Sequence, residues 1–162
     1  MNSSQKKVPM SIIIYCDGLC EPINPNGIAT YGFVVYRDGT RMHEDFGVTG
    51  VGQGMSNNVA EYDALCKAFD YLKSQGLTAQ EVIVRSDSRL LIKQMSGAWK
   101  KRPKGLYAAK YLEAHNLQRS FNHVKYQWIS RELNKEADVL TREAYKNYCK
   151  TKGIRERYYV MP

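Results

Sequence analysis

The 162-residue sequence is poor in the residues that form metal-thiolate sites and disulfide frameworks. It has only three histidines and four cysteines, and no cysteine lies in a CxxC pair or beside a histidine. This spacing argues against a zinc site. Reduced thiols in a reducing compartment are the simpler interpretation of Cys16, Cys20, Cys66 and Cys149. Whether Cys16 and Cys20 pair is left open.

Long apolar runs are also absent. No segment approaches the roughly 18 apolar residues of a membrane helix, and residues 1–10, MNSSQKKVPM, lack the apolar stretch of a signal peptide. The length and the 43% hydrophobic content fit one compact domain. The glycine-rich VTGVGQGMSNN lacks the spacing of a dinucleotide or P-loop fingerprint. We therefore expect a monomeric, unexported cytoplasmic protein that does not bind membranes.

What the chain has in excess is positive charge. Twenty-four Lys and Arg against sixteen Asp and Glu give a net charge of +8 and a pI near 9.3, which favours a polyanionic partner such as nucleic acid. The segment WKKRPKGLYAAKY places Lys100, Lys101, Arg102, Lys104 and Lys110 among Trp99, Tyr107 and Tyr111. Cations and flat rings together suit phosphates and bases. The alternative is a solvated helix start after Pro103 whose tyrosines face the core.

Apolar periodicity predicts three strands in the first third of the chain. Residues 11–17 form an apolar run, after which Gly18 is expected to let the chain turn. Residues 30–36 and 41–48 alternate as strands do, and Asp38-Gly39 between them is a strong hairpin signal. We predict an antiparallel meander.

The remainder predicts helices alternating with two further strands. Strands are expected near residues 81–86 and 124–129, and helices over residues 59–74, 88–94, 106–117 and 134–145, with Asn58 capping the first helix. A strand after a long helix indicates a parallel crossover. The pattern predicts a mixed α/β sheet.

Four acids stand where a folding chain resists charge: Asp17, Glu61, Asp87 and Asp138. Asp17 and Asp87 end apolar strands, and Glu61 shares the apolar stripe of its helix with Leu65, Phe69 and Leu72. Taken singly, each acid has an ordinary structural explanation, such as a turn, a helix cap or a solvated helix position. Together they indicate one carboxylate cluster that requires a cation.

The order of elements and four sequence blocks resemble the ribonuclease H family. The blocks are YCDG with the later NPNG, SNNVAEYDAL, SDSRLLIKQ and WISRELNKEAD. The resemblance covers about residues 11–146 and implies a five-stranded mixed sheet, three strands antiparallel and then two parallel, flanked by helices. We expect residues 1–10 to be an extension and residues 147–162 a basic tail, in which residues 158–160 are either loose or an edge strand.

The resemblance also implies a site and an activity. Asp17, Glu61, Asp87 and Asp138 would bind two Mg²⁺ ions, with Mn²⁺ able to substitute, and the enzyme would hydrolyse the RNA strand of an RNA–DNA hybrid to leave 5′-phosphate and 3′-hydroxyl ends. Hard cations prefer such oxygen ligands. The implied substrate-binding residues are Asn24, Ser56, Asn57, Asn58, Trp99, Lys100, Lys101, Arg102, Arg131 and Asn134. The asparagines would read the 2′-hydroxyl.

The sequence departs from the common bacterial pattern in the loop before the last acid. Arg131 stands nearest the position where those members carry a histidine. Arginine does not act as a base near neutral pH, so it would contact phosphate or assist product release. An archaeal-like subgroup with arginine there is described as also cutting double-stranded RNA. Two alternatives stay open: a non-catalytic nucleic-acid-binding domain on the same fold, and a related nuclease with another substrate.

Overall fold

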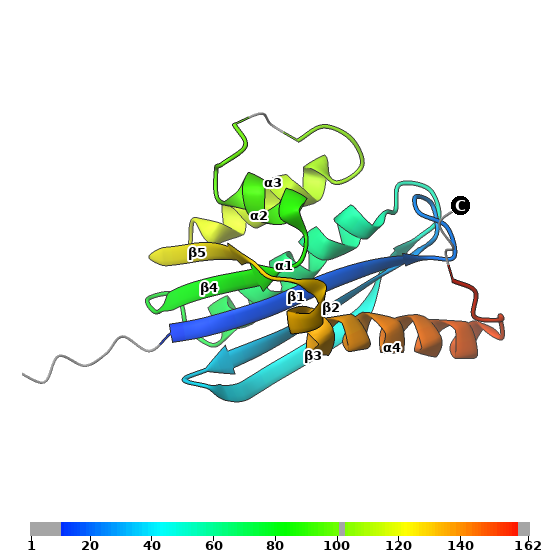
Figure 1. Cartoon of the computed structure of the whole chain (residues 1–162), viewed down its shortest axis with the longest axis horizontal. Helices are drawn as coiled ribbons and strands as arrows, with labels where there is room; N and C mark the ends of the chain where they lie inside the picture. Colours follow the sequence, from blue (N-terminus) through cyan, green and yellow to red (C-terminus); the bar gives the residue numbers. More distant parts are fainter. Residues whose placement is uncertain (1–10, 101–102, 159–162) are drawn as a thin grey trace, which may run out of the picture.

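A single five-stranded sheet with helices on both faces forms the molecule (Figure 1). The structure is a computed structural model that describes residues 11–100 and 103–158. In chain order the elements are β1 (Ser11–Glu21), β2 (Ile28–Arg37), β3 (Thr40–Val51), α1 (Asn57–Ser74), β4 (Glu81–Ser86), α2 (Arg89–Met95), α3 (Ala108–Gln118), β5 (His123–Trp128), the 3₁₀ helix η1 (Arg131–Asn134) and α4 (Lys135–Lys152).

The strand order β3-β2-β1-β4-β5 confirms the predicted mixed sheet. β1, β2 and β3 are antiparallel neighbours, whereas β4 and β5 run parallel to β1. The β2–β3 hairpin turns at Asp38 and Gly39, whose φ angles of 49° and 78° are both positive, as a type I′ turn requires.

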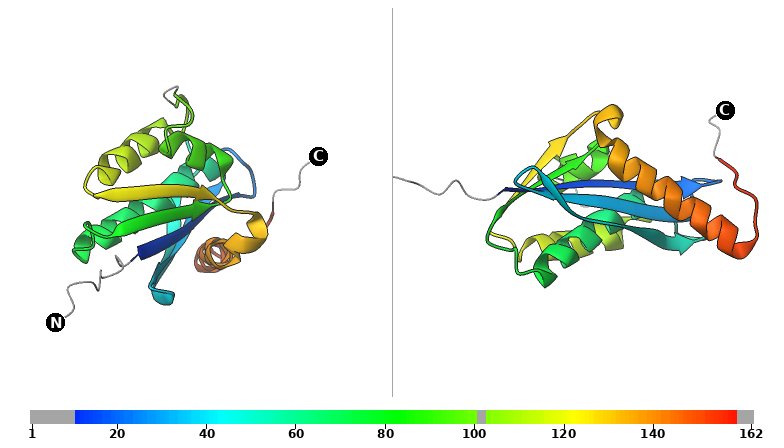
Figure 2. Two further views of the ribbon diagram at one scale, coloured as in Figure 1. Left: turned by 60° about the vertical axis from the view of Figure 1, so that its left-hand side comes forward. Right: turned by 90° about the horizontal axis from the view of Figure 1, so that it is seen from below.

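The helices cover the two faces unequally. In Figure 2, α1, α2 and α3 lie on one face of the sheet and α4 runs along the other. The main core fills the first interface, where Ile12 and Ile14 of β1 meet Leu65 and Phe69 of α1. Alternate residues of β1 are fully buried, as the period of two requires.

β1 does not end at Asp17 as predicted. The strand continues through Gly18 to Glu21 and pairs with β2 along this whole stretch. Gly18 is not a turn residue but a point of close contact between β1 and α1. A Cβ at this position would stand 2.3 Å from the backbone nitrogen of Glu61 and 2.7 Å from the Cβ of Ala60. The missing side chain lets the start of α1 approach the middle of β1.

Two helix ends also differ from prediction. The cap of α1 is Ser56, whose Oγ accepts a hydrogen bond from the backbone N–H of Val59 at 3.1 Å, and not Asn58. α4 extends seven residues beyond Tyr145 and ends at Gly153, which has a φ of 65°. The first residues of the expected tail are therefore helical, and residues 159–160 of the suggested edge strand lie outside the described residues.

The cysteines are buried and unpaired. Cys16, Cys20, Cys66 and Cys149 all carry free thiols. Within residues 11–100 and 103–158, no helix combines the length and apolar character needed to cross a membrane.

Substituting Gly18 by alanine should destabilise the fold by about 2–4 kcal/mol, because the new methyl group meets backbone atoms that cannot rotate away. Urea unfolding of both proteins measures this difference. Gly47→Ala in β3 is the control, since its Cβ would stand 3.1 Å from the nearest atom, the hydroxyl oxygen of the Tyr31 side chain. Equal stability of Gly18→Ala and the parent protein would contradict the close approach.

Candidate active site

The four predicted acids come together around the C-terminal end of β4. Asp17 lies in β1 and Asp87 directly follows β4, its parallel neighbour. Glu61 lies in the second turn of α1, and Asp138 in the first turn of α4. Burial raises the pKa of the Asp17 carboxyl well above its ordinary value, and the carboxylates of Asp87, Glu61 and Asp138 raise it further, in that order. Asp17 is thus close enough to each of the other three acids to be repelled by its charge.

Burial also disfavours the charged form of Glu61. Its side chain is 9% exposed. Burial, followed by the nearby Asp87 carboxylate, raises its pKa from an ordinary value of 4.5 to about 8, although a hydrogen bond with Ser88 and the positive charge of Arg131 act in the opposite direction. Uncharged carboxylic acid is the favoured form at neutral pH when no cation is bound.

Like Glu61, the other three carboxylates already have protein partners. Asp17 accepts the backbone N–H of Gly18 at 2.9 Å, Asp87 accepts the amide of Asn134 at 2.8 Å, and Asp138 accepts Nε of Arg142 at 3.3 Å. In the part of the chain that the structure describes, no group of three or more Asp, Glu, His or Cys side chains is arranged to hold a metal ion. Joint ligation therefore requires side-chain rotation.

Asn134 is buried and holds Asp87 through a hydrogen bond. This position differs from the substrate-binding role that the sequence predicted for it. Its side chain is 2% exposed. The Nδ2 atom donates to Asp87 and to the carbonyl oxygen of Cys16 at 3.0 Å, which ties η1 to β1 and to the end of β4. Its Oδ1 atom is buried and has no hydrogen-bond partner among the described residues.

The polar residues before α1 join the β1–β2 loop to the helix. Asn24 donates to Asn57 Oδ1 at 2.8 Å, and its own Oδ1 accepts the Asn57 backbone N–H at 3.1 Å. Asn24, Asn57 and Asn58 are half-buried, so each is partly accessible. The Ser56 hydroxyl is buried in the helix cap, so its side chain is already used structurally.

Only part of the predicted basic surface lies within the described residues. Trp99 is 49% exposed and Lys100 is exposed, whereas Lys101 and Arg102 lie outside the described residues. Lys110 Nζ instead pairs with the buried Asp63 at 3.0 Å.

The two tyrosines of the same segment face the protein. Tyr107 stacks on Tyr62 with ring centroids 5.7 Å apart, and Tyr111 meets Tyr62 edge to face. Tyr107 also accepts a hydrogen bond from Gln94 Nε2 at 3.0 Å. The alternative interpretation, tyrosines that face the core, is correct for these residues.

Arg131 reaches the site from η1 while remaining open to solvent. Its side chain is 83% exposed, and its Nε atom lies 3.9 Å from Asp87 Oδ2. An exposed arginine at the rim of an acidic site is placed to contact a phosphate.

Three residues that contact the acids were not predicted from the sequence. Trp128 Nε1 donates to the backbone carbonyl of Asp87 at 3.1 Å, Ser88 bonds Glu61, and Arg142 bonds Asp138. Only the Arg142 contact had a sequence signal, because residues four apart on a helix lie on the same face.

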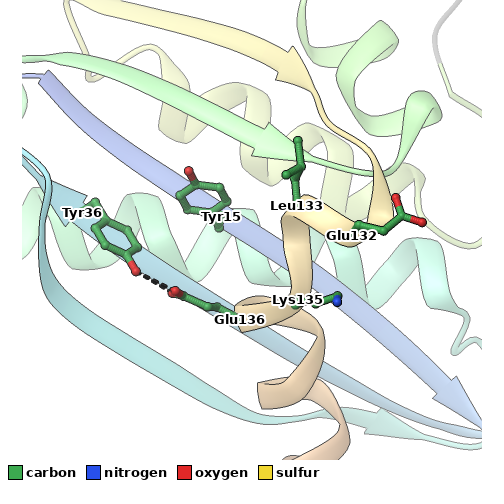
Figure 3. Close-up of a pocket in the computed structure, with 6 residues that line it drawn as sticks. All are labelled: Tyr15, Tyr36, Glu132, Leu133, Lys135 and Glu136. Atoms are coloured by element: carbon green, nitrogen blue, oxygen red, sulfur yellow. Dashed lines mark hydrogen bonds between the residues drawn. The ribbon is translucent and has the colours of Figure 1, made fainter.

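A shallow pocket lies beside η1, where α4 begins (Figure 3). It is lined by Tyr15, Tyr36, Glu132, Leu133, Lys135 and Glu136. The Tyr36 hydroxyl donates to the Glu136 carboxylate at 2.7 Å. This bond fixes the first turn of α4, and with it the backbone of Asp138, against β2.

The donor set fits a hard divalent cation. It consists of carboxylate oxygens, which Mg²⁺ and Mn²⁺ prefer to nitrogen or sulfur. A cation nearby would also stabilise the charged carboxylates of Asp17 and Glu61, which burial and repulsion now disfavour, and would lower their pKa values. The unpartnered Oδ1 of Asn134 is a further acceptor beside Asp87.

Comparison with known proteins finds related sequences and folds. A sequence profile described as "Reverse transcriptase-like" matches residues 16–144. The chain is 35% identical over 135 residues to "Bifunctional protein Rv2228c" of Mycobacterium tuberculosis, covering 83% of this chain and 35% of that protein. It is 33% identical to "Ribonuclease HI" of Halobacterium salinarum over 80% of this chain and 62% of that protein. The chain therefore spans about a third of the mycobacterial relative.

Solved structures match more completely. The N-terminal RNase H domain of Rv2228c from M. tuberculosis superposes with a TM-score of 0.76 at 31% identity, over 88% of this chain and 99% of that one. LC11-RNase H1, solved in complex with an RNA/DNA hybrid, gives a TM-score of 0.76 at 34% identity, over 85% and 98% of the two chains. From its sequence match, its strand order and these neighbours, the chain belongs to the ribonuclease H family.

Proposed function

We propose that this protein is a ribonuclease H that hydrolyses the RNA strand of RNA–DNA hybrids and leaves 5′-phosphate and 3′-hydroxyl ends. The observation that carries the proposal is the convergence of Asp17, Glu61, Asp87 and Asp138 on one partly buried site. Its relative in H. salinarum is named Ribonuclease HI, and LC11-RNase H1 binds an RNA/DNA hybrid. Both support the same substrate for this chain.

The four acids would hold two divalent cations, Mg²⁺ with Mn²⁺ as a substitute. When bound, such cations supply an activated water and stabilise the charge that develops on a cleaved phosphodiester. Asn134 keeps Asp87 in place through its amide, and Ser88 does the same for Glu61. Since Asp17, Glu61 and Asp138 sit on three different elements and Asp87 on the loop after β4, the protein's contribution is the fixed backbone geometry of the ligands.

Substrate would be contacted beside this site by residues of the β1–β2 loop and of the start of α1. Asn24, Asn57 and Asn58 offer amide donors and acceptors suited to the 2′-hydroxyl and the minor groove of a hybrid. The two hydrogen bonds between Asn24 and Asn57 restrict the conformations of these residues before substrate binds. Arg131, which is exposed at the rim, would contact a backbone phosphate.

Double-stranded RNA is a second candidate substrate. Arg131 supports this substrate, because a guanidinium can bind a phosphate of any duplex. An RNA duplex also presents 2′-hydroxyls, which the asparagines could bind as they would in a hybrid. A non-catalytic binding domain is less favoured. Such a domain gains nothing from buried, mutually repelling carboxylates next to a polyanion.

In EDTA, the free energy of unfolding should fall by a few kcal/mol as the pH rises from about 5 to 8. The folded chain keeps a proton on Glu61 up to about pH 8, whereas the unfolded chain releases it near the ordinary value of 4.5. The unfolded state therefore binds fewer protons in this window, and stability decreases with rising pH. Urea unfolding across this range measures the slope.

Two controls accompany this measurement. Glu61→Gln should make the slope less steep, because it removes one titrating group at nearly constant volume; Asp17, whose pKa burial and the neighbouring acids also raise, contributes the remainder. Saturating Mg²⁺ should raise stability more at pH 8 than at pH 5, because the cation competes with protons for the same oxygens. A slope that Glu61→Gln leaves unchanged would show that another group causes the pH dependence.

Cleavage should be confined to the RNA strand of a labelled hybrid and should require Mg²⁺ or Mn²⁺. The same sequence prepared as RNA duplex, DNA duplex and single strands tests the alternatives, and cutting of the RNA duplex would establish the second substrate. Asp87→Asn should lower the cleavage rate by at least about a thousandfold while hybrid binding persists, since a ligand charge is removed without loss of volume. Full activity in Asp87→Asn would refute the site, and binding without cutting by the parent protein would favour the non-catalytic domain.

Replacing Lys100, Lys101 and Arg102 together by alanine should weaken hybrid binding and flatten its salt dependence. The slope of log affinity against log salt should fall by about one for each phosphate that the variant no longer neutralises. The matched control replaces Lys146, Lys150 and Lys152 on α4, which removes the same charge from another element. Equal slopes in the two triple variants would mean that the 100–102 segment acts only through net charge.

A further inference from the structure

The Asp138 carboxylate is held by a cation of its own helix. Arg142 lies one turn after Asp138 in α4, and its Nε atom donates to Asp138 Oδ2 at 3.3 Å. The Asp138 side chain is 28% exposed and that of Arg142 is 47% exposed. Asp17, Glu61 and Asp87, by contrast, are hydrogen-bonded to neutral groups, and Arg131 stands further away, at 3.9 Å from Asp87.

The backbone that carries this pair is fixed to the sheet. The Thr30 hydroxyl of β2 donates to the carbonyl oxygen of Thr141 at 2.9 Å, inside the buried interface. At Gly32, a Cβ would stand 2.8 Å from both the Ala137 carbonyl oxygen and the Leu140 Cβ, so β2 and α4 are in close contact. Asp138 can therefore change its partner only by side-chain rotation and not by a shift of the helix.

The C-terminal segment borders Arg142 on its other side. The Tyr145 hydroxyl donates to the Arg157 carbonyl oxygen at 2.6 Å and accepts the Arg157 N–H at 3.0 Å. The next residue, Tyr158, contacts the Tyr145 ring and lines a small surface pocket together with Val139 and Arg142. This packing limits the directions in which Arg142 can leave Asp138.

We propose that Arg142 is a positioning residue that holds Asp138 by its Oδ2 atom and opposes the binding of divalent cations, so that it sets the cation concentration at which this fourth ligand joins the site. The inference rests on the proposed function, because it takes Asp138 to be a metal ligand. Arg142 makes no direct contact with Asp17, Glu61 or Asp87 among the hydrogen bonds and ion pairs of the described residues.

Two effects of removing Arg142 oppose each other. Loss of the ion pair frees the Asp138 side chain, but an exposed pair four residues apart on a helix contributes little order or stability. Loss of the guanidinium also removes a positive charge 3.3 Å from the carboxylate oxygen that would bind a cation, and the repulsion between the two positive charges would be the larger effect at low salt. Cation binding should therefore become tighter.

The test is isothermal titration of the EDTA-treated, dialysed full chain with MgCl₂ or MnCl₂ in the absence of nucleic acid. Arg142→Gln should bind the cation about three to ten times more tightly than the parent protein at low salt, and the difference should shrink at high salt. Arg142→Lys, which keeps the charge, should restore an affinity near that of the parent. Lys150→Gln removes one charge about 12 Å further along the same helix and should leave the affinity unchanged.

The outcomes separate this inference from the proposed function. Equal or weaker cation binding by Arg142→Gln, or tighter binding by Lys150→Gln to the same extent, would overturn the role of Arg142 while leaving the metal site intact. Parent protein that binds no divalent cation would overturn both. A purely structural role for Arg142 would lower the unfolding temperature of Arg142→Gln without changing its cation affinity, and this result would also overturn the inference.

Discussion

Repulsion among partly buried carboxylates is the constraint on which the other features of this protein depend. Asp17 and Glu61 have raised pKa values because burial and the neighbouring acids disfavour their charged forms. A chain that needed only stability would place apolar residues here. The fold instead gives each acid a compensating partner: a backbone N–H for Asp17, the Ser88 hydroxyl for Glu61, the Asn134 amide for Asp87 and a guanidinium for Asp138.

These partners can work only because the backbones beneath them are held together by close packing. Gly18 admits the start of α1, and Gly32 admits α4, so that the two helices approach β1 and β2 from opposite faces. Neither contact involves a carboxylate group. The positions of the four carboxylates therefore follow from the absence of side chains at Gly18 and Gly32 and from the parallel pairing of β1 with β4. Repulsion among the carboxylates would not by itself bring them together.

The sequence predicted those parts of the structure that depend on local pattern. Alternating apolar residues marked the strands and Asp38-Gly39 marked the hairpin. Asp17, Glu61 and Asp87 were singled out by their apolar surroundings, and Asp138 by the block WISRELNKEAD. The errors concern long-range partners. In the sequence alone Gly18 looks like a turn residue, whereas in the structure α1 packs against it. Asn134 likewise looks like a surface polar residue, whereas its amide donates a hydrogen bond to Asp87, 47 residues away. Ser56, Asn57 and Asn58 are all good capping residues, so sequence could not choose among them.

The ion pair of Lys110 shows why net charge is a poor guide to affinity for nucleic acid. Its ammonium group, which the sequence assigned to a basic surface, is paired with Asp63 in the interior, and Lys67 lies 3.3 Å from the same carboxylate. Arg142 is likewise paired with Asp138. Positive charge that is committed to buried acids cannot release counterions from a phosphate backbone. Exposed side chains such as Lys100 and Arg131 keep their charge open to solvent. Arg131 also stands 3.9 Å from Asp87, and its positive charge lowers the pKa of Glu61, so charge at the rim and charge at the acidic site are linked through this one side chain.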